Sequence, residues 1–530
     1  MKMIRLTFFN IIAFVWILTT GQVQAAIVLP QLVGDNMIIQ RDIKIPIWGW
    51  AAAGEKISVN FKNESYSAVA GADGKWAVTL KESLHGGPYL MTIEGAAEVL
   101  KIKNILIGDV WICSGQSNMA FNFNALKSLY PDDAAIRNSY DQEIAASAND
   151  NIRQIIVNRN YSAAPQSTVK MTGWKIAGPN TIMSFSSVAY FFAKHLYEKY
   201  NVPIGLINAS YGGTPAEAWM SADALKKFPQ FSKTIRFLKD TAALTSKVIL
   251  YKERMAAWDS KTDKKENEVR PRAYEAAVLP TVLFNAMINP IISYGIKGVV
   301  WYQGENNQLR GYEYRDLFPA LINDWRSRWG QGNFPFVYQQ LVNFKEVSKV
   351  PAEAYWAELR EAQLMSLSKQ ANTAMAVGID LGIANNIHPP NKKDVGERLA
   401  LAAMKIAYKE TDLVTSGPLY RSMRVDNDKI IISFSNIGQG LAAKGGGALK
   451  YFSIAGADKK FVWASAVIKG NQVIVSSEQI PDPVAVRYAW ANNPEGCNLT
   501  NIEGLPASPF RTDNWPGLSA KTVYVNNDIP

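Results

Sequence analysis

Three polar turns in this sequence carry the residue types of nucleophilic catalysis. Ser117 stands in the turn Gly-Gln-Ser-Asn-Met, Gln303 and Glu305 stand in a second turn, and His388 stands in a third. A serine hydroxyl becomes a nucleophile when an imidazole takes its proton, and amide N–H groups can stabilise the charge that develops on a carbonyl oxygen. Because turns also collect serine for conformational reasons, Ser117 by itself does not decide the chemistry.

The choice of a general base is narrow, because the chain has three histidines. His195 falls on the charged side of a predicted amphipathic helix, and His85 falls beside glycines in a predicted loop. His388 precedes the start of another predicted helix. If a serine mechanism operates, we therefore expect His388 to be the base.

Amide donors and a carboxylate are available in two of the turns. Gly212 and Gly213 follow a predicted strand, where a backbone N–H can approach a ligand closely, although a helix start that needs unusual dihedrals has the same appearance. Gln303 has a side-chain amide that could donate to an oxyanion. Glu305 could orient a histidine, or it could hold its own loop by bonding backbone amides.

The elements that must position these residues alternate between strand and helix. This alternation predicts an α/β fold, with a mostly parallel sheet covered by helices on both faces, and the polar turns lie at the carboxyl ends of its strands. The strands are expected at 105–113, 152–157, 202–209, 298–302, 335–339 and 373–379, and the helices at 184–200, from 216, at 318–329, at 355–368 and after 391. A helical insertion, acting as a lid or rim, is expected at about 229–272, with a charged stretch from 259.

The remaining chain divides into a leader and two β-rich regions. Residues 1–25 have a basic start, a short apolar run and small residues before Ala26, which predicts a cleavable signal peptide and a secreted or periplasmic protein without a membrane anchor. Residues 26–104 predict an N-terminal β-sandwich, and 413–530 a C-terminal β-rich domain. The catalytic domain is then expected at 105–412.

Composition excludes several partners. The formal charge of +10 is scattered along the chain and forms no basic patch, so we expect no nucleic-acid partner. Cys113 and Cys497 are interpreted as free, and no Cys/His spacing predicts a metal site. The oligomeric state stays open.

Four blocks, in order along the chain, resemble those of the SGNH hydrolases in the form used by the sialate O-acetylesterase and related carbohydrate acetylesterase families. The resemblance implies a flavodoxin-like sheet and a carbohydrate O-acetylesterase that needs no metal or organic cofactor. It also implies a Ser117 nucleophile, a His388 base, and an oxyanion hole made by Ser117, Gly212 and Gln303. The blocks are Asp109 with Gly115–Met119, Asn208–Thr214 with Glu217–Trp219, Trp301–Glu305, and Asn386–Lys392 with Asp394–Leu399.

One position departs from the family pattern. Many SGNH enzymes place the acid that orients the histidine three residues before it, but that position is Asn385 here. Glu305, Asp380 or a serine-histidine dyad without an acid must take over this role, and we favour Glu305.

Three functions remain open at this stage. A sialate O-acetylesterase needs a cation for the sugar carboxylate, for which Arg159, Arg270 and Arg310 are candidates. An esterase for plant polysaccharides such as acetylxylan or xyloglucan needs an open groove lined by aromatics such as Trp219 or Tyr302. A carbohydrate-binding protein that has lost its activity is the third.

Overall fold

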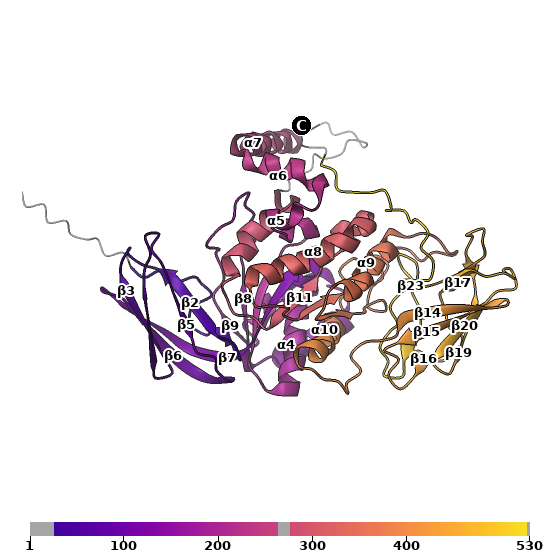
Figure 1. Ribbon diagram of the computed structural model, residues 1–530, viewed down its shortest axis with the longest axis horizontal. Coiled ribbons are helices and arrows are strands. Elements are labelled where there is room, and N and C mark those ends of the chain that lie inside the picture. The colour runs from indigo at the N-terminus through magenta and orange to yellow at the C-terminus, as the bar shows by residue number, and fades with distance from the viewer. Residues whose placement is uncertain (1–25, 263–275, 527–530) are drawn as a thin grey trace, which may run out of the picture.

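The computed structural model describes residues 26–262 and 276–526. The predicted signal peptide at 1–25 and most of the charged stretch at 259–272 lie outside the described residues. Three regions follow one another in Figure 1: an indigo β-region, a central α/β domain, and a yellow β-region. No helix within 26–262 and 276–526 has the length and apolar character to cross a bilayer.

The central sheet is built around one long strand, β7 (Val99–Gly115). The strand order is β13-β12-β11-β7-β10-β8-β9, and all neighbours except the pair β8 and β9 are parallel. Five of the six parallel strands in this order, β7, β10, β11, β12 and β13, have the spatial order 2-1-3-4-5, one of the doubly wound arrangements, and the sixth, β8, pairs with β10. The bounds of the other strands are β8 Asn149–Ile156, β9 Lys175–Ala177, β10 Ile204–Ser210, β11 Gly298–Tyr302, β12 Phe336–Gln339 and β13 Thr373–Ala376.

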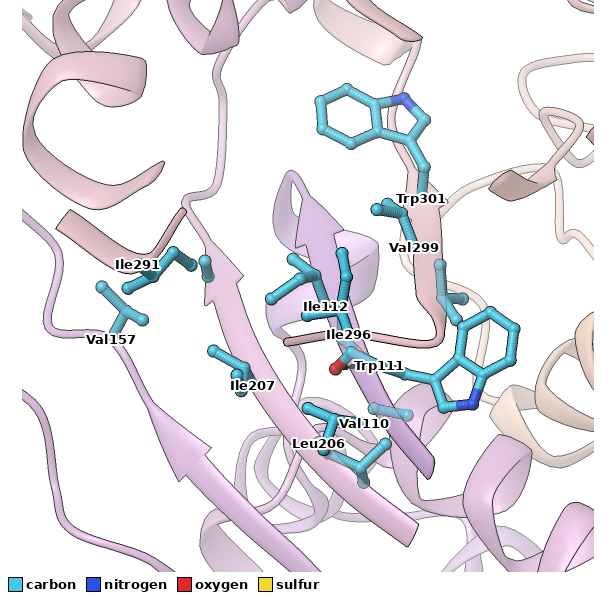
Figure 2. Close-up of a cluster of buried hydrophobic side chains, with 14 of the residues drawn as sticks. Val110, Trp111, Ile112, Val157, Leu206, Ile207, Ile291, Ile296, Val299 and Trp301 are labelled. Carbon is cyan, nitrogen blue, oxygen red and sulfur yellow. Dashed lines mark hydrogen bonds between the residues drawn. The ribbon is translucent and has the colours of Figure 1, made fainter. Parts of the chain in front are cut away.

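Helices cover the sheet in two pairs. Helix α4 (Ser187–Tyr200) packs on α10 (Lys392–Ala407), and α8 (Gly311–Trp329) packs on α9 (Tyr355–Lys369). Figure 1 shows the sheet between the two pairs. Because both faces are covered, the central strands are buried and mostly apolar. Figure 2 shows side chains of β7, β10 and β11 among their buried neighbours.

The N-terminal β-region shares β7 with the central sheet. Residues 99–107 of β7 pair with β6, while residues 109–115 pair with β10, so the domain boundary expected at residue 104 falls inside a continuous strand. The strand expected at 105–113 therefore begins earlier, at Val99. The other strands of this region are β1 Ile38–Gln40, β2 Ile45–Trp50, β3 Lys56–Phe61, β4 Glu64–Val69, β5 Lys75–Leu80 and β6 Gly86–Glu94.

The C-terminal β-region contains two four-stranded sheets, β14-β15-β20-β19 and β18-β17-β21-β23, and the pair β16-β22. After β23 the chain returns to the central domain, as the yellow trace in Figure 1 shows, and the ring of Tyr524 lies 4.6 Å from that of Phe231. The strands are β14 Leu419–Asp426, β15 Lys429–Ser435, β16 Leu441–Ala443, β17 Phe452–Ala455, β18 Val462–Trp463, β19 Ser465–Lys469, β20 Gln472–Ser476, β21 Ala485–Tyr488, β22 Leu499–Asn501 and β23 Phe510–Arg511.

The insertion after residue 229 is helical over its described part, with α6 (Ser232–Lys239) followed by α7 (Thr241–Asp259). The two helices separate at Asp240, whose carboxylate accepts from the Ala243 amide and caps α7. The helix expected from residue 216 is a 3₁₀ turn, Ala216–Trp219, followed by the short α5 (Ala222–Leu225). Other helices are α1 Ser117–Ala120, α2 Phe123–Leu129, α3 Ala134–Ala145 and the 3₁₀ turn Glu305–Arg310. Cys113 and Cys497 are both free.

Candidate active site

Ser117 is placed by the way β7 ends. Gly115 has a φ of +132°, and a Cβ at this position would lie 2.1 Å from the Tyr302 carbonyl oxygen, so no other residue fits so close to the end of β11. The Gln116 amide then donates to that same oxygen at 3.0 Å. The chain turns there, and Ser117 begins α1 at the carboxyl edge of the sheet.

The structure brings Ser117 and His388 together. The Oγ atom of Ser117 lies 2.9 Å from the Nε2 atom of His388, across 271 positions of sequence, and both residues are partly exposed. This is the distance at which an imidazole can take a proton from a hydroxyl. The pair therefore has the geometry of a nucleophile and its base, open to a ligand from solvent.

Several contacts fix the His388 loop. The Tyr130 hydroxyl donates to the His388 carbonyl oxygen at 2.7 Å, and the His388 amide donates to Oδ1 of Asn386 at 2.9 Å. The ring of Phe121 lies 4.4 Å from the imidazole, centroid to centroid. Burial, and secondly the charge of Lys392, lower the pKa of His388 to about 4, so the imidazole is neutral and ready to accept a proton near neutral pH.

Neither Asp380 nor the residue at the family's acid position, Asn385, orients the imidazole. Asp380 is engaged elsewhere, with Arg398 at 2.5 Å and Lys444 at 3.1 Å. Burial raises the pKa of the Asp380 carboxyl, but these two cations outweigh burial and lower it. Asn385 is exposed and lines a separate cavity with Asp380 and Lys444. Asp380 is therefore excluded as the direct partner of His388 in this structure.

Glu305 is near the site but does not contact the imidazole. Within the described ranges, no group accepts a hydrogen bond from Nδ1 of His388. Oε1 of Glu305 instead accepts from Nδ2 of Asn118 at 2.6 Å, and the same Nδ2 donates to the Ile387 carbonyl oxygen at 3.1 Å. The expectation that Glu305 orients His388 directly is not met. Asn118 connects the carboxylate to the residue before the histidine.

A buried lysine completes this connection. Nζ of Lys392 donates to Oδ1 of Asn118 at 2.5 Å, which fixes the amide so that its nitrogen faces Glu305 and Ile387. Lys392 is fully buried, and burial lowers the pKa of its ammonium to about 7. Burial raises the pKa of Glu305 despite the bond from Asn118. Sequence reasoning missed Lys392 and Asn118, although both stand in the motifs that carry Ser117 and His388.

Gly212 lies against the serine, as expected for an oxyanion-hole donor. A Cβ placed on Gly212 would be 3.3 Å from the Ser117 Cβ, and the Tyr211 amide donates to the Gly115 carbonyl oxygen at 3.1 Å. The turn after β10 is thereby fixed to the end of β7. The Gly212 and Ser117 amides consequently lie on two adjoining turns.

Gln303 does not reach the serine. It is fully buried, and its Nε2 donates to the Thr214 carbonyl oxygen at 3.2 Å and to Oδ1 of Asn307 at 2.7 Å. Since both amide hydrogens are used, Gln303 stabilises the loop and is not available to an oxyanion. This corrects the expectation for Gln303.

Asn306 occupies the position between the two turns. Its amide donates to Oε1 of Gln116 at 3.3 Å, and its Nδ2 donates to the Gly213 carbonyl oxygen at 2.6 Å. The residue is exposed, and one further hydrogen on Nδ2 is left for a ligand. Its place in the polar run after β11 was the sequence signal that could have identified it.

Of the arginines and aromatic residues expected to contact the sugar, only Arg159 is exposed near the site. Arg159 is exposed, with its guanidinium 5.4 Å from the centre of the Tyr211 ring, beside Gly212. Arg310 is committed to Glu217 and Glu313, and Arg270 lies outside the described residues. Trp219 and Tyr302 are fully buried, so neither lines an open groove as expected.

Comparison with known proteins decides the family. Residues 107–405 match the family model of "Carbohydrate esterase, sialic acid-specific acetylesterase". The chain belongs to this family. Sialate O-acetylesterases of Homo sapiens (29% identical over 531 residues; 92% of this chain, 93% of the relative) and Rattus norvegicus (30% over 520 residues; 90% and 92%) are similar along most of their length.

A solved structure agrees with the assignment. A carbohydrate acetylesterase from Xanthomonas citri superposes with a TM-score of 0.79 and is 37% identical, covering 92% of this chain and all of that one. Family membership makes the protein a carboxylic-ester hydrolase, and the family and this structure together support a carbohydrate O-acetylesterase with an O-acetylated sugar as substrate.

Proposed function

We propose that the protein is a secreted sialate O-acetylesterase of the SGNH type that acts through Ser117 and His388. The observation that carries the mechanism is the 2.9 Å contact between Ser117 Oγ and His388 Nε2. Ser117 Oγ attacks the acetyl carbonyl carbon while Nε2 takes its proton. The tetrahedral intermediate then expels the sugar oxygen, which receives the proton from His388.

Water completes the cycle. His388 takes a proton from the water that attacks the acetyl-enzyme, and acetate leaves as Ser117 regains its proton. In both steps the oxyanion is stabilised by the amides of Ser117 and Gly212, and by Nδ2 of Asn306 in place of Gln303. Asn118, held by Lys392 and bonded to Glu305, positions the histidine loop.

We further propose that Arg159 selects the substrate. Sialic acids carry a carboxylate, and a guanidinium beside the Gly212 turn can pair with it. The family description and the names of the curated relatives both favour a sialic acid. An acetylated plant polysaccharide would use the same Ser117 and His388 without requiring Arg159.

The test measures acetate release from 9-O-acetylated sialic acid, acetylated xylan and 4-nitrophenyl acetate. Ser117→Ala is expected to lower kcat by at least about a thousandfold on every substrate that the wild type hydrolyses. Arg159→Ala is expected to raise KM about tenfold or more for the sialate ester alone, because one charge-assisted contact is lost. Arg424→Ala, an exposed arginine of the C-terminal region, is the matched control.

The outcomes separate the parts of the proposal. Full activity in Ser117→Ala would remove the serine mechanism. Hydrolysis of acetylated xylan but not of the sialate ester, with no effect of Arg159→Ala, would assign the protein to plant polysaccharides instead.

Secretion rests on residues 1–25 of the sequence. We propose cleavage before Ala26. Expression of the full chain in a secretory host should give a mature protein whose N-terminal sequence starts at Ala26 and whose mass is that of residues 26–530. An intact N-terminus on cytoplasmic protein would contradict secretion.

A further inference from the structure

A cavity of about 160 Å³ lies where the C-terminal β-region meets the loop that follows β12. It is lined by residues 351–353 of that loop, by side chains near β17 and β18, and by residues at the end of β21. Neither Ser117 nor His388 is among its lining residues. Its aromatic and charged side chains include Tyr451, Phe461, Trp463, Trp490, Glu353 and Arg487.

Trp463 is an exposed ring held in a fixed orientation. Trp463 is 39% exposed. Its Nε1 nevertheless donates to the Lys349 carbonyl oxygen at 2.9 Å, which fixes the ring. The ring of Tyr451 packs edge-on at 5.6 Å between centroids. A large aromatic side chain that is fixed and yet exposed offers a flat apolar face to a ligand.

The polar part of the cavity is ordered, and its buried guanidinium is fully paired. The guanidinium of Arg487 lies 4.2 Å from the centre of the Phe461 ring, and its side chain is only 4% exposed. It donates to Oε1 of Glu353 at 2.7 Å and pairs with Asp513 at 2.8 Å. The Glu353 side chain remains 36% exposed, so its carboxylate can still accept hydrogen bonds from a ligand.

We propose that this cavity binds one neutral pyranose ring of a glycan chain, as a second carbohydrate site apart from Ser117. The inference rests on one part of the proposed function, namely that the substrate is a glycan. The C–H face of a pyranose packs on aromatic rings, and its hydroxyls donate to carboxylates. Drug-sized ligands occupy about 300 Å³ or more, so the cavity suits a single ring.

The charges favour a neutral sugar over an anionic one. Arg487 pairs with Glu353 and with Asp513, which Arg511 also contacts at 3.3 Å. The Arg487 guanidinium therefore has no unpaired charge to offer a ligand carboxylate. Lys459 also lines the cavity, but its side chain is exposed at the rim, with the ammonium 5.6 Å from the ring of Trp515, so solvent screens its attraction for a carboxylate. An anionic sugar would instead meet the Glu353 carboxylate.

The experiment uses full-length protein with Ser117→Ala, which removes turnover without removing the cavity. Binding of xylohexaose, cellohexaose and 3′-sialyllactose is measured by calorimetry and by tryptophan fluorescence. Trp463→Ala and Glu353→Gln are each added, with Val467→Ala, an exposed apolar residue of the same region, as the control. The Glu353→Gln variant keeps the side-chain shape, in case loss of the Trp463 bond to Lys349 disturbs the loop.

At least one neutral hexasaccharide is expected to bind saturably, about tenfold more weakly in Trp463→Ala and in Glu353→Gln, and equally well in Val467→Ala. The proposal would be overturned by no saturable binding of either neutral sugar, or by binding of sialyllactose alone. It would also be overturned if both cavity variants bound as tightly as the Ser117→Ala parent. The proposed catalytic function fails on a different result, namely no acetate released from any glycan by the wild type.

Discussion

Lys392→Met should move the acid limb of the activity profile to higher pH. Lys392 is protonated below its pKa of about 7, so it is charged where His388 titrates, near pH 4. A neighbouring cation disfavours the imidazolium, and removing it therefore raises the pKa of His388. Methionine has a similar length and removes only the charge and the donor to Asn118.

The size of the shift follows from the two causes that act on His388. Burial and Lys392 together lower its pKa from 6.5 to about 4, and burial is the larger cause. Lys392 thus accounts for at most about one pH unit. A shift of that size lowers the neutral fraction of the imidazole at pH 4.5 about threefold.

The assay is kcat/KM for 4-nitrophenyl acetate between pH 3.5 and 8. Lys392→Arg keeps the charge and should keep the limb in place, while Lys393→Met removes a neighbouring charge whose side chain is 59% exposed and should have no effect. A lower kcat/KM on the plateau above the acid limb would report the loss of the bond from Lys392 to Asn118, and it does not affect the midpoint of the limb. An acid limb that stays, or that moves to lower pH, in Lys392→Met would refute the reasoning.

Three further changes test the remaining contacts. Glu305→Gln keeps the acceptor for Asn118 but removes the charge, and should lower kcat by about ten- to a hundredfold with 4-nitrophenyl acetate; an unchanged kcat would show that the charge is not used. Gly212→Ala forces the new methyl group to within 3.3 Å of the Ser117 Cβ, and a shift of a few tenths of an ångström should cost about tenfold in kcat, with the melting temperature nearly unchanged. Asp380→Asn should leave kcat/KM within about threefold, because Asp380 does not contact His388, but should lower the unfolding free energy by about 1–3 kcal/mol in chemical denaturation.

The sequence located the proposed nucleophile and the proposed base because both positions depend on local order. Ser117 follows a long apolar strand, and among three histidines only His388 lies in a loop at the edge expected for the site. Their contact at 2.9 Å does not follow from the strand order, because β12 and β11 separate β13, which precedes His388, from β7. The loop between β13 and α10 brings the histidine to the serine. The strands around them were recognisable for the same reason, since burial on both faces leaves a mostly apolar run.

Side-chain direction was not predictable in this way. Whether the Gln303 amide faces the serine depends on Thr214 and Asn307, which reach it from elsewhere and occupy both of its hydrogens. Trp219 and Tyr302 are of the aromatic types on which sugar rings stack, yet the packing of the sheet buries both of them fully. Residue type and spacing therefore located the loops, while the partners of each polar group had to come from the structure.

The arrangement around His388 divides two tasks that one acid performs in a serine-histidine-aspartate triad, namely orienting the imidazole and stabilising its positive charge. Orientation here comes from Tyr130 on the His388 carbonyl oxygen, from the Phe121 ring, and from Asn118 on the preceding carbonyl oxygen. In the mechanism that we propose, the negative charge comes from Glu305, which bonds Asn118 and does not contact the imidazole. Because Lys392 fixes that asparagine, the same buried cation that opposes the imidazolium also keeps the carboxylate connected to its loop. Loss of Lys392 should accordingly change two quantities independently: the midpoint of the acid limb, through the pKa of His388, and the plateau of kcat/KM, through the position of the loop. In a triad, one acid bonded directly to the histidine would change both together.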